Sequence, residues 1–289
     1  VCSSDLNTLN EACVNLHMLR IVLFTLIVIV SNFVSAQVGL KEVFVEKYYT
    51  LAKNDYQKSN VSGAKEKGLV TYRIYVELDS GYTLQAVYGM PSHPLKISSS
   101  EVFYNHPGIG NTHPNIIPDK ALKKNLTILD SWITIGACAE SFFAVPLKYQ
   151  TKAFPVVIEW EKGYFENTKG RDSEFSFRDA PGMIYRGTDS LPQLTIYQLD
   201  EPLKGLFAES NQNEILVTDG AWACLGKGAS APKPYKNAIL IAQLTTAGKL
   251  SYELNLQLGT PDGKSVRYVA SNPTTEELTH PSLTQKPKK

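Results

Sequence analysis

Alternation between apolar and polar residues at every second position constrains the fold of this chain more than any other feature. In residues 70–78, VTYRIYVEL, every second side chain is apolar, and after the turn Asp79-Ser80-Gly81 the alternation resumes in residues 82–88, YTLQAVY. Residues 238–244 and 250–258 repeat this arrangement around Gly248. A period of two is that of a β-strand with one buried face, and two such runs joined by a short turn predict a hairpin. We therefore expect two β-hairpins.

Further strands are predicted along most of the chain. The turn Pro261-Asp262-Gly263 leads into a strand at residues 265–270. Shorter strand-like segments are residues 43–49, 102–104, 132–135, 156–160, 194–198 and 215–218. Only residues 118–126 and 201–209 give weak helical signals, each near a proline. Many short strands separated by turns are typical of all-β folds. We expect an antiparallel β-sandwich or a jelly-roll-like fold with little helix.

The segment before Gln37 combines an artefact with the pattern of an export signal. Residues 1–6, VCSSDL, look like a translated sequencing adaptor, and we expect residues 1–17 to be an artefact or an upstream read. Residues 18–36 begin at Met18 and contain a short basic start, an apolar stretch and small residues at a cleavage site, which together predict a signal peptide. The apolar stretch is shorter than the roughly 20 residues that a membrane span needs. We expect a secreted protein that begins at Gln37, without a membrane span, and lies extracellularly, at the cell surface or in the periplasm.

The remainder predicts one folded domain and a tail. Residues 91–118 and 163–192 are rich in Gly, Pro, Asn, Ser and Asp but contain interspersed aromatic residues, which favours long ordered loops over flexible linkers. We therefore expect a single β-sandwich-type domain over residues 37–278. Residues 279–289 contain only one large apolar residue, Leu283, and predict a disordered tail.

Charge and cysteine content limit the partners and the covalent chemistry. The formal net charge is +1, and lysine and arginine cluster only at the last residues, so we expect no nucleic-acid partner. Cys138 and Cys224 are the two cysteines that follow the signal peptide, and an oxidising compartment would allow them to form one disulfide. The alternative is two buried free thiols that behave as small apolar side chains.

Three short segments resemble a known family. They are TYRIY at residues 71–75, LDSWITIG at residues 129–136 and ILIAQLTT at residues 239–246. Together they resemble an uncharacterised family of secreted bacterial β-rich domains, in which a TYR-x-Y, a DSW-x-TIG and a LIAQ-x-TT motif recur in this order. The resemblance covers about residues 43–273. It implies a β-rich module of extracellular or surface proteins, often joined to adhesion-type repeats or sorting tails, and it implies no catalytic activity.

Motifs that would carry chemistry are few. The sequence contains no Walker motif, no GxSxG elbow and no HExxH motif. His93, His106 and His113 lie in one predicted loop, but each precedes a proline, which favours an extended turn over a metal ligand. We expect no cofactor. A calcium site in an open loop is the alternative to a solvated loop, and its candidate ligands are Asp172, Glu174, Asp179 and Asp189.

Aromatic residues provide the strongest candidates for a binding site. A tyrosine beside a turn can stack on a sugar while its hydroxyl group stays in water, although the same residue can simply cover the edge of a sheet. The candidates are Tyr82, Tyr88, Tyr104, Tyr164 and Tyr185. Two segments of similar sequence, Asp130 to Trp132 and Asp219 to Trp222, resemble a catalytic carboxylate pair. We expect both to be structural, with the aspartates accepting backbone hydrogen bonds and the tryptophans anchoring strands in the core.

These observations favour a secreted, non-enzymatic module at the cell surface or in the matrix that binds glycan or protein in adhesion. The alternative is a secreted hydrolase of carbohydrate or ester, whose acid residues assemble only in three dimensions. A third possibility is an architectural spacer domain. The sequence leaves the ligand and the oligomeric state open.

Overall fold

The computed structural model divides the chain into two compact units, Val1–Val38 and Gly39–Lys289. It describes residues 39–51, 68–105, 111–118, 129–149, 158–161, 164–167, 182–200, 202–203 and 212–286, the backbone alone at 158–161 and 164–167. The expected artefact and signal peptide lie outside the described residues. Strands dominate the described residues, in which the helical elements are short 3-10 turns and one α-helical turn, where the amide of Leu203 donates to the carbonyl of Leu199. The labelled 3-10 turns are η1 (Pro114–Ile116), η4 (Leu147–Tyr149), η6 (Thr188–Ser190) and η7 (Pro281–Leu283). The expected all-β sandwich is confirmed.

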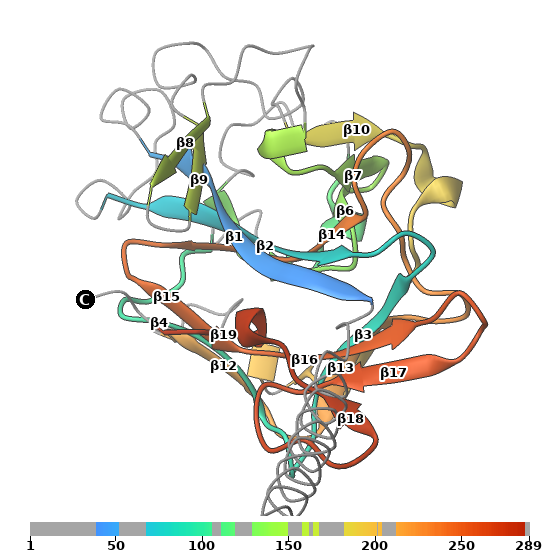
Figure 1. Cartoon of the computed structure of the whole chain (residues 1–289). Coiled ribbons are helices and arrows are strands. Elements are labelled where there is room, and N and C mark those ends of the chain that lie inside the picture. Colours follow the sequence, from blue (N-terminus) through green and yellow to red (C-terminus); the bar gives the residue numbers. More distant parts are fainter. Residues whose placement is uncertain are drawn as a thin grey trace, which may run out of the picture. The chain divides into compact units, whose positions relative to one another are not determined.

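The middle layer is a six-stranded sheet, which we call sheet A (Figure 1). Its strands, in spatial order, are β5 (Trp132–Ile133), β14 (Ala238–Thr246), β2 (Val70–Leu78), β1 (Leu40–Thr50), β9 (Tyr164–Asn167) and β8 (Ile158–Glu161). Neighbouring strands are antiparallel except β1 and β9, which are parallel. All nine residues of β14 are buried, as expected for a strand that is covered on both faces.

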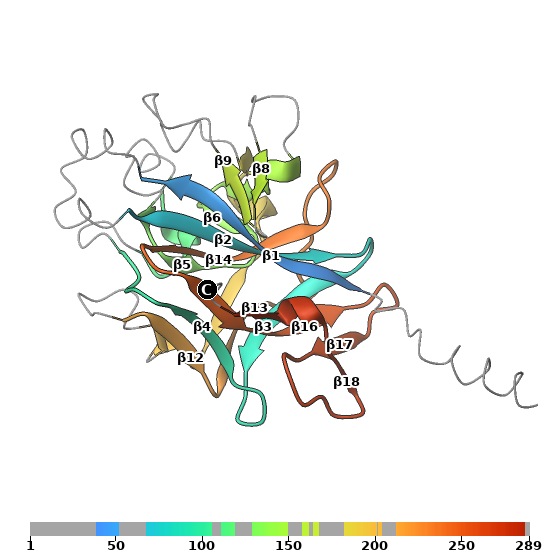
Figure 2. The same ribbon diagram turned by 60° about the vertical axis from the view of Figure 1, so that its left-hand side comes forward.

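The layer below sheet A consists of two sheets that continue into each other (Figure 2). Sheet B contains β11 (Leu194–Tyr197), β13 (Gly220–Cys224), β3 (Thr83–Gly89), β16 (Asn255–Gly259), β17 (Ser265–Tyr268) and β18 (Glu277–Leu278). Sheet C contains β12 (Glu214–Val217), β4 (Leu95–Ser99), β15 (Leu250–Glu253) and β19 (Thr284–Gln285). Each of β3, β13 and β16 is adjacent in sequence to its counterpart β4, β12 or β15, so the chain bends three times where the two sheets meet.

A small third layer covers the opposite face of sheet A. This sheet D contains β10 (Met183–Tyr185), β7 (Phe142–Ala144) and β6 (Ala137–Ala139). Sheet A therefore separates two apolar cores. The first core lies toward sheets B and C and includes Ile74 and Trp222, and the second lies toward sheet D and includes Tyr75 and Trp132. Because consecutive residues of a strand point to opposite faces, Ile74 and Tyr75 of β2 belong to different cores.

Both predicted hairpins are wrong, although their strands exist. β2 pairs with β1 and β14 in sheet A, whereas β3 pairs with β13 and β16 in sheet B. Likewise β14 lies in sheet A, while β15 and β16 lie in the layer below. The turns at 79–81 and 247–249 thus carry the chain from one layer to the other. The predicted strand at 265–270 does form a hairpin, between β16 and β17.

The expected disordered tail is also wrong for residues 279–286. Leu283 is fully buried in the first core, and β19 adds to the edge of sheet C beside β15. Ser282 Oγ accepts a hydrogen bond of 2.7 Å from the amide of Val43, and Tyr252 donates one to the carbonyl of Ser282. One buried leucine and these backbone contacts hold a segment whose composition alone indicates disorder.

The proposed disulfide between Cys138 and Cys224 does not form, because both cysteines are free and buried. Cys138 lies on β6 in the second core, and Cys224 lies on β13 against the first core. Sheet A lies between the two cores, which keeps the sulfur atoms on opposite sides of it. The alternative of two buried thiols is the one observed.

Candidate functional site

The three family-like segments lie on adjacent strands of sheet A. TYRIY lies in β2, ILIAQLTT lies in β14, and the tryptophan of LDSWITIG begins β5. The spatial order of these strands is β5-β14-β2. In the register of these strands, Gln243 of β14 lies opposite both Arg73 of β2 and Trp132 of β5. On the other side of β2, Glu46 of β1 lies opposite Arg73. Four side chains from separate parts of the sequence therefore form one row across four strands.

This row, Glu46-Arg73-Gln243-Trp132, is fully buried beneath sheet D. Arg73 Nε donates a hydrogen bond of 3.0 Å to Gln243 Oε1, and Gln243 Nε2 donates one of 3.0 Å to the carbonyl of Asp130. A second cross-strand contact lies two residues further along β2 and β14, where the hydroxyl groups of Thr71 and Thr245 are 2.8 Å apart. The polar residues of the segments thus form one internal hydrogen-bond network.

Ser131 connects this network to the loop before β5. Its hydroxyl group donates a hydrogen bond of 2.8 Å to the carbonyl of Tyr104 and accepts one of 2.9 Å from the amide of Thr245. The side chain of Asn105 accepts from the amide of Ser131 and donates to its carbonyl. A serine followed by a tryptophan therefore fixes β5 beside β14, and Trp132 is then inserted into the second core.

Arg73 joins sheet A to the covering layer. Its Nη1 donates a hydrogen bond of 3.0 Å to the carbonyl of Gly182, next to β10, and its guanidinium lies 3.4 Å from the centre of the Tyr48 ring. Burial lowers the pKa of Arg73, but the neighbouring Tyr48, Tyr75, Cys138 and Glu46 together outweigh it, so the pKa is raised. Arg73 is therefore charged and in contact with both layers.

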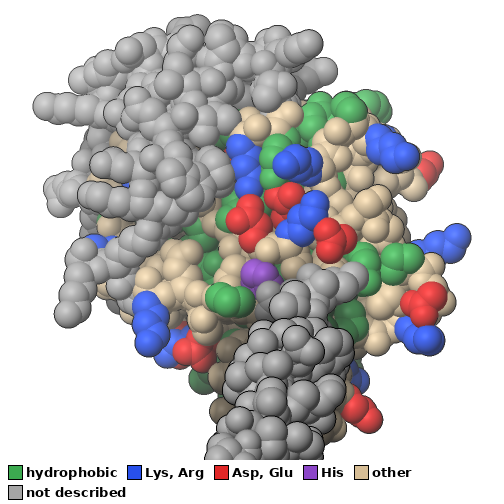
Figure 3. Space-filling view, viewed as in Figure 1, with side chains coloured by type: hydrophobic (Ala, Val, Ile, Leu, Met, Phe, Trp, Pro, Cys, Tyr) green, Lys and Arg blue, Asp and Glu red, His purple; other side chains and the backbone are tan. Residues whose placement is uncertain are grey.

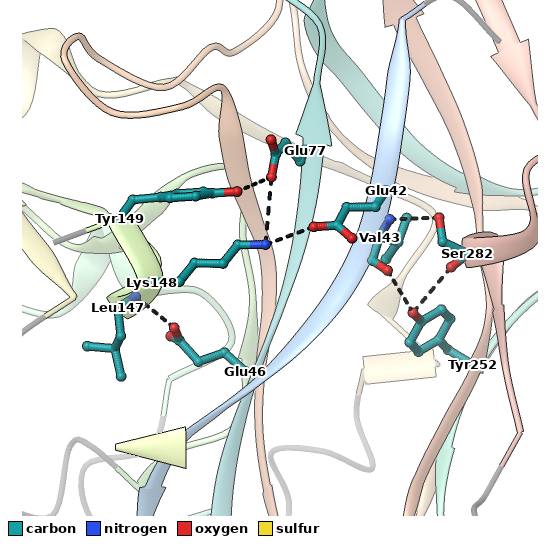
Figure 4. Close-up of polar contacts among 9 residues, drawn as sticks. All are labelled: Glu42, Val43, Glu46, Glu77, Leu147, Lys148, Tyr149, Tyr252 and Ser282. Carbon is teal, nitrogen blue, oxygen red and sulfur yellow. Dashed lines mark hydrogen bonds and ion pairs between the residues drawn. The ribbon is translucent and has the colours of Figure 1, made fainter. Parts of the chain in front are cut away.

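Glu46 is the second buried ionisable group of the row. Its Oε1 accepts a hydrogen bond of 2.7 Å from the amide of Leu147 at the start of η4 (Figure 4). Its Oε2 is buried and has no hydrogen-bond partner in the described part of the chain. Burial raises the pKa of Glu46 to about 7, although Arg73 and Lys148 act in the opposite direction.

A charged cluster lies at the rim of this network, where η4 meets β1 and β2. Lys148 Nζ is 2.8 Å from Glu42 and 3.7 Å from Glu77, and Tyr149 donates a hydrogen bond to Glu77 (Figure 4). The ammonium group also lies 3.4 Å from the centre of the Phe44 ring. Charged side chains of both signs gather over this part of the molecular surface (Figure 3). Opposite charges compensate one another here, which favours a structural role.

The buried network has the chemistry of a clamp between layers. Burial in the same core raises the pKa of Cys138 to about 12, so its thiol is protonated and unreactive at neutral pH. All four side chains of the row are fully buried, so none of their polar groups reaches the molecular surface. This arrangement can hold sheet D on sheet A, but it offers no surface to a substrate.

A different surface, the outer face of sheet B, is accessible. The face has one cross-strand row of Tyr197, Ala221, Tyr88 and Asn255, and a second row of Thr195, Ala223, Ala86 and Gln257. These eight side chains include no charged group. Tyr197 is 60% exposed, Tyr88 and the three alanines are half-buried, and Asn255 is fully buried. We call this surface the tyrosine face.

The charged residues of sheet B lie beside the tyrosine face. Arg267 of β17 is opposite Gln257, and Glu277 of β18 is opposite Arg267. Glu277 also lies 3.1 Å from Nε2 of His93, and the amide of Thr274 donates to it at 2.9 Å. Hydrogen bonds from the Thr274 amide are the main reason why the pKa of Glu277 is lowered.

The predicted tyrosines do not form one site. Tyr88 lies on the tyrosine face, whereas Tyr82 and Tyr104 pack against the first and second cores. Tyr185 is 68% exposed on sheet D, with its ring centre 5.6 Å from that of Phe142. The side chain of Tyr164 lies outside the described residues. Sequence reasoning missed Tyr197, although its position at the end of the alternating strand LTIY indicates an outward side chain.

The aspartate and tryptophan segments differ in their surroundings. Trp132 and Trp222 are fully buried, in the second and first core respectively, and Trp222 donates a hydrogen bond of 3.1 Å to the carbonyl of Ile241. Asp130 is buried in the network of sheet A, whereas Asp219 is exposed where sheets B and C meet. The two carboxylates thus lie in different layers and different environments.

The histidines and the acidic loop residues show no common site. His93 contacts Glu277, His113 precedes η1, and His106 lies outside the described residues. Of the calcium candidates, Asp189 lies in η6, and Asp172, Glu174 and Asp179 fall outside the described residues. In the described part of the chain, no group of three His, Cys, Asp or Glu residues could hold a metal ion, and no helix could span a membrane.

Models of known protein families, curated proteins and solved structures were compared with the chain, and none of them matches it.

Proposed function

We propose that this protein is a secreted, non-enzymatic module that binds glycan or protein through the tyrosine face. The observation that carries the proposal is the composition of this face. Seven neighbouring side chains that are at least partly exposed include an exposed tyrosine, a half-buried tyrosine and the amide of Gln257, without a single charge. Tyrosine offers a large, rigid contact area with a polar end, which suits recognition at a surface.

The buried network supports the proposal indirectly. Arg73, Glu46 and Gln243 form a polar cluster of the kind found in catalytic sites. All three are fully buried between sheets A and D. Their contacts account for the polar residues in the family-like segments without a substrate. An accessible surface elsewhere is then the better candidate for function.

Export supports the extracellular setting. Residues 18–36 have the pattern of a signal peptide. The three segments resemble secreted β-rich domains, and that resemblance implies no catalytic activity. A β-sandwich with an exposed sheet face is also an architecture that lectin domains use. These points favour adhesion over hydrolysis.

The proposal can be tested with one substitution on the tyrosine face and one control. Ala223→Arg places a charged side chain in the middle of the face, and Leu216→Arg adds the same charge at an exposed position of sheet C. We expect purified protein to bind immobilised glycans or matrix proteins, and we expect Ala223→Arg alone to abolish that binding. Binding that survives Ala223→Arg contradicts the proposal, as does turnover of a carbohydrate or ester substrate by the wild-type protein.

A further inference from the structure

The geometry points to a specific ligand class for the tyrosine face: we propose that it binds a neutral, extended polysaccharide chain that runs across the strands of sheet B and stacks on Tyr197 and Tyr88. This inference rests on the proposed function, because it names the ligand of the same surface.

The positions of the two tyrosines define the direction of the chain. Tyr197 of β11 lies opposite Ala221 of β13, and Ala221 lies opposite Tyr88 of β3. The two tyrosines therefore occupy one cross-strand row and are separated by a single strand. Strands in a sheet are about 4.8 Å apart, so the backbone positions of Tyr197 and Tyr88 are roughly 10 Å apart. This is comparable to the length of two sugar units in an extended chain.

The residues between and beside the tyrosines leave room for such a chain. Ala221 lies between the rings, and Ala223 and Ala86 occupy the next row of the face. A larger side chain at any of these three positions would stand between the tyrosines or beside them. The alanines therefore keep the surface between the two rings low and even.

The distribution of charge on sheets B and C favours a neutral ligand over an anionic one. The eight residues of the tyrosine face include no charged side chain, and the exposed Arg267 beside Gln257 lies opposite Glu277, which compensates its charge. Sheet C presents Lys96 and Glu214, which form an ion pair of 2.5 Å. Anionic polymers are held by lysine and arginine, and charge on the surface also attracts them from a distance. A face without charge lacks both effects and matches a ligand without charge.

Polar groups of the face are held in place before a ligand arrives. Gln257 Nε2 donates a hydrogen bond of 3.0 Å to Gln85 Oε1, and Ser265 donates one of 2.8 Å to the same oxygen. Asn255 is fully buried, and its amide donates to the carbonyl groups of Tyr88 and His93, so it supports the face without meeting a ligand. A fixed amide such as that of Gln257 loses little conformational entropy when it binds, and it can form hydrogen bonds with sugar hydroxyl groups.

Tyr88 adds a hydroxyl group that is not satisfied within the described residues. Its Oη is buried and has no hydrogen-bond partner there. Burial and the nearby Glu277 raise the pKa of Tyr88 to about 12, so the phenol keeps its proton at neutral pH. Tyr88 thus contributes a ring for stacking, while its buried hydroxyl group stays uncharged.

The inference is tested by pull-down with insoluble polysaccharides and by titration with soluble oligosaccharides. The panel contains neutral chains (cellulose, chitin, xylan and mannan) and anionic chains (pectin and alginate). We expect binding to at least one neutral chain, with affinity that increases between a disaccharide and a tetrasaccharide. Tyr197→Ala should raise the Kd about 3- to 10-fold, as expected for loss of one aromatic contact.

Two controls separate stacking from loss of fold. Tyr185→Ala removes a similarly exposed tyrosine from sheet D and should leave the Kd unchanged. Tyr197→Phe keeps the ring and should retain most of the affinity. Unchanged melting temperatures in all three variants show that the fold is intact.

The outcomes distinguish this inference from the proposed function. Binding only to anionic chains, or only to a protein, overturns the neutral polysaccharide but leaves the binding function in place if Ala223→Arg abolishes that interaction. Neutral polysaccharide binding that Tyr197→Ala and Ala223→Arg both leave unchanged overturns the site and, with it, the proposed function.

Discussion

Arg73 and Gln243 are 170 positions apart, yet Arg73 Nε donates a hydrogen bond of 3.0 Å to Gln243 Oε1 between neighbouring strands of sheet A. This contact joins two of the three family-like segments, and Gln243 extends it to the third through the carbonyl of Asp130. The segments are therefore parts of a single internal structure. Their polar residues hold sheets A and D together, and the tyrosine face on sheet B is available for binding.

The first prediction concerns this contact. Arg73→Met removes a buried guanidinium and leaves its partners unpaired, so we expect it to lower the free energy of unfolding by about 3 to 5 kcal/mol. Gln243→Leu should cost less, and the double variant should cost less than the sum of the two, because both single changes break the same hydrogen bond. Denaturant melts of the three variants measure this coupling. Simple additivity would contradict the network.

The second prediction concerns pH. The pKa of Glu46 is about 7 in the folded protein and 4.5 ordinarily, so the folded state holds the proton more tightly than the unfolded state. Stability from this group is therefore complete below about pH 4.5 and is lost as the pH rises toward and through 7. The change is roughly 3 kcal/mol, since each pKa unit corresponds to about 1.4 kcal/mol.

Glu46→Gln tests this dependence because glutamine keeps an oxygen that can accept from the Leu147 amide but cannot ionise. We expect the variant to be more stable than the wild type at pH 8 and to lose the decline between pH 5 and 8. Glu253→Gln, at an exposed position of β15, is the matched control and should keep the wild-type profile. Parallel profiles for wild type and Glu46→Gln would show that Glu46 is not the group responsible.

The third prediction concerns the cysteines. Burial raises the pKa of Cys138 to about 12 and also raises that of Cys224, so both thiols should resist alkylation in the folded protein at pH 8. After unfolding in denaturant without a reductant, mass spectrometry should find both thiols alkylated. A product in which neither reacts until a reductant is added would demonstrate a disulfide and contradict the separation of the two cores.

The fourth prediction concerns the C-terminal segment. Leu283 is fully buried, and Leu283→Ala should cost about 2 to 5 kcal/mol in the free energy of unfolding. Leu278→Ala, at a leucine that is 37% exposed, should cost much less. Thermal melts compare the two directly. Equal, small effects would mean that the segment is not part of the core.

The sequence predicts the strands of this fold better than their partners. The alternation in residues 70–78 predicts the bounds of β2, Val70–Leu78, but its single apolar face does not predict that both faces of the strand are buried. It contains no information on which strand lies beside β2, and a short turn at residues 79–81 serves a hairpin and a crossing between layers equally well. That ambiguity explains why both predicted hairpins are wrong.

The candidate sites were predicted in part, for similar reasons. Arg73 and Glu46 alternate with apolar residues and so have the pattern of a solvated face, and only the third layer, sheet D, makes them buried. The uninterrupted apolar run in β14 is the one sequence signal for such a layer. Tyr88 was a candidate because it lies beside a turn, whereas its relation to Tyr197 depends on the register through β13.

The role of the tyrosine face is tested most directly by a binding isotherm on a neutral polysaccharide for wild type, Ala223→Arg and Leu216→Arg, at one pH and ionic strength. We expect saturable binding by the wild type and by Leu216→Arg, and no measurable binding by Ala223→Arg, with equal melting temperatures for all three. Binding by Ala223→Arg with the wild-type Kd would contradict the assignment of the tyrosine face as the binding surface.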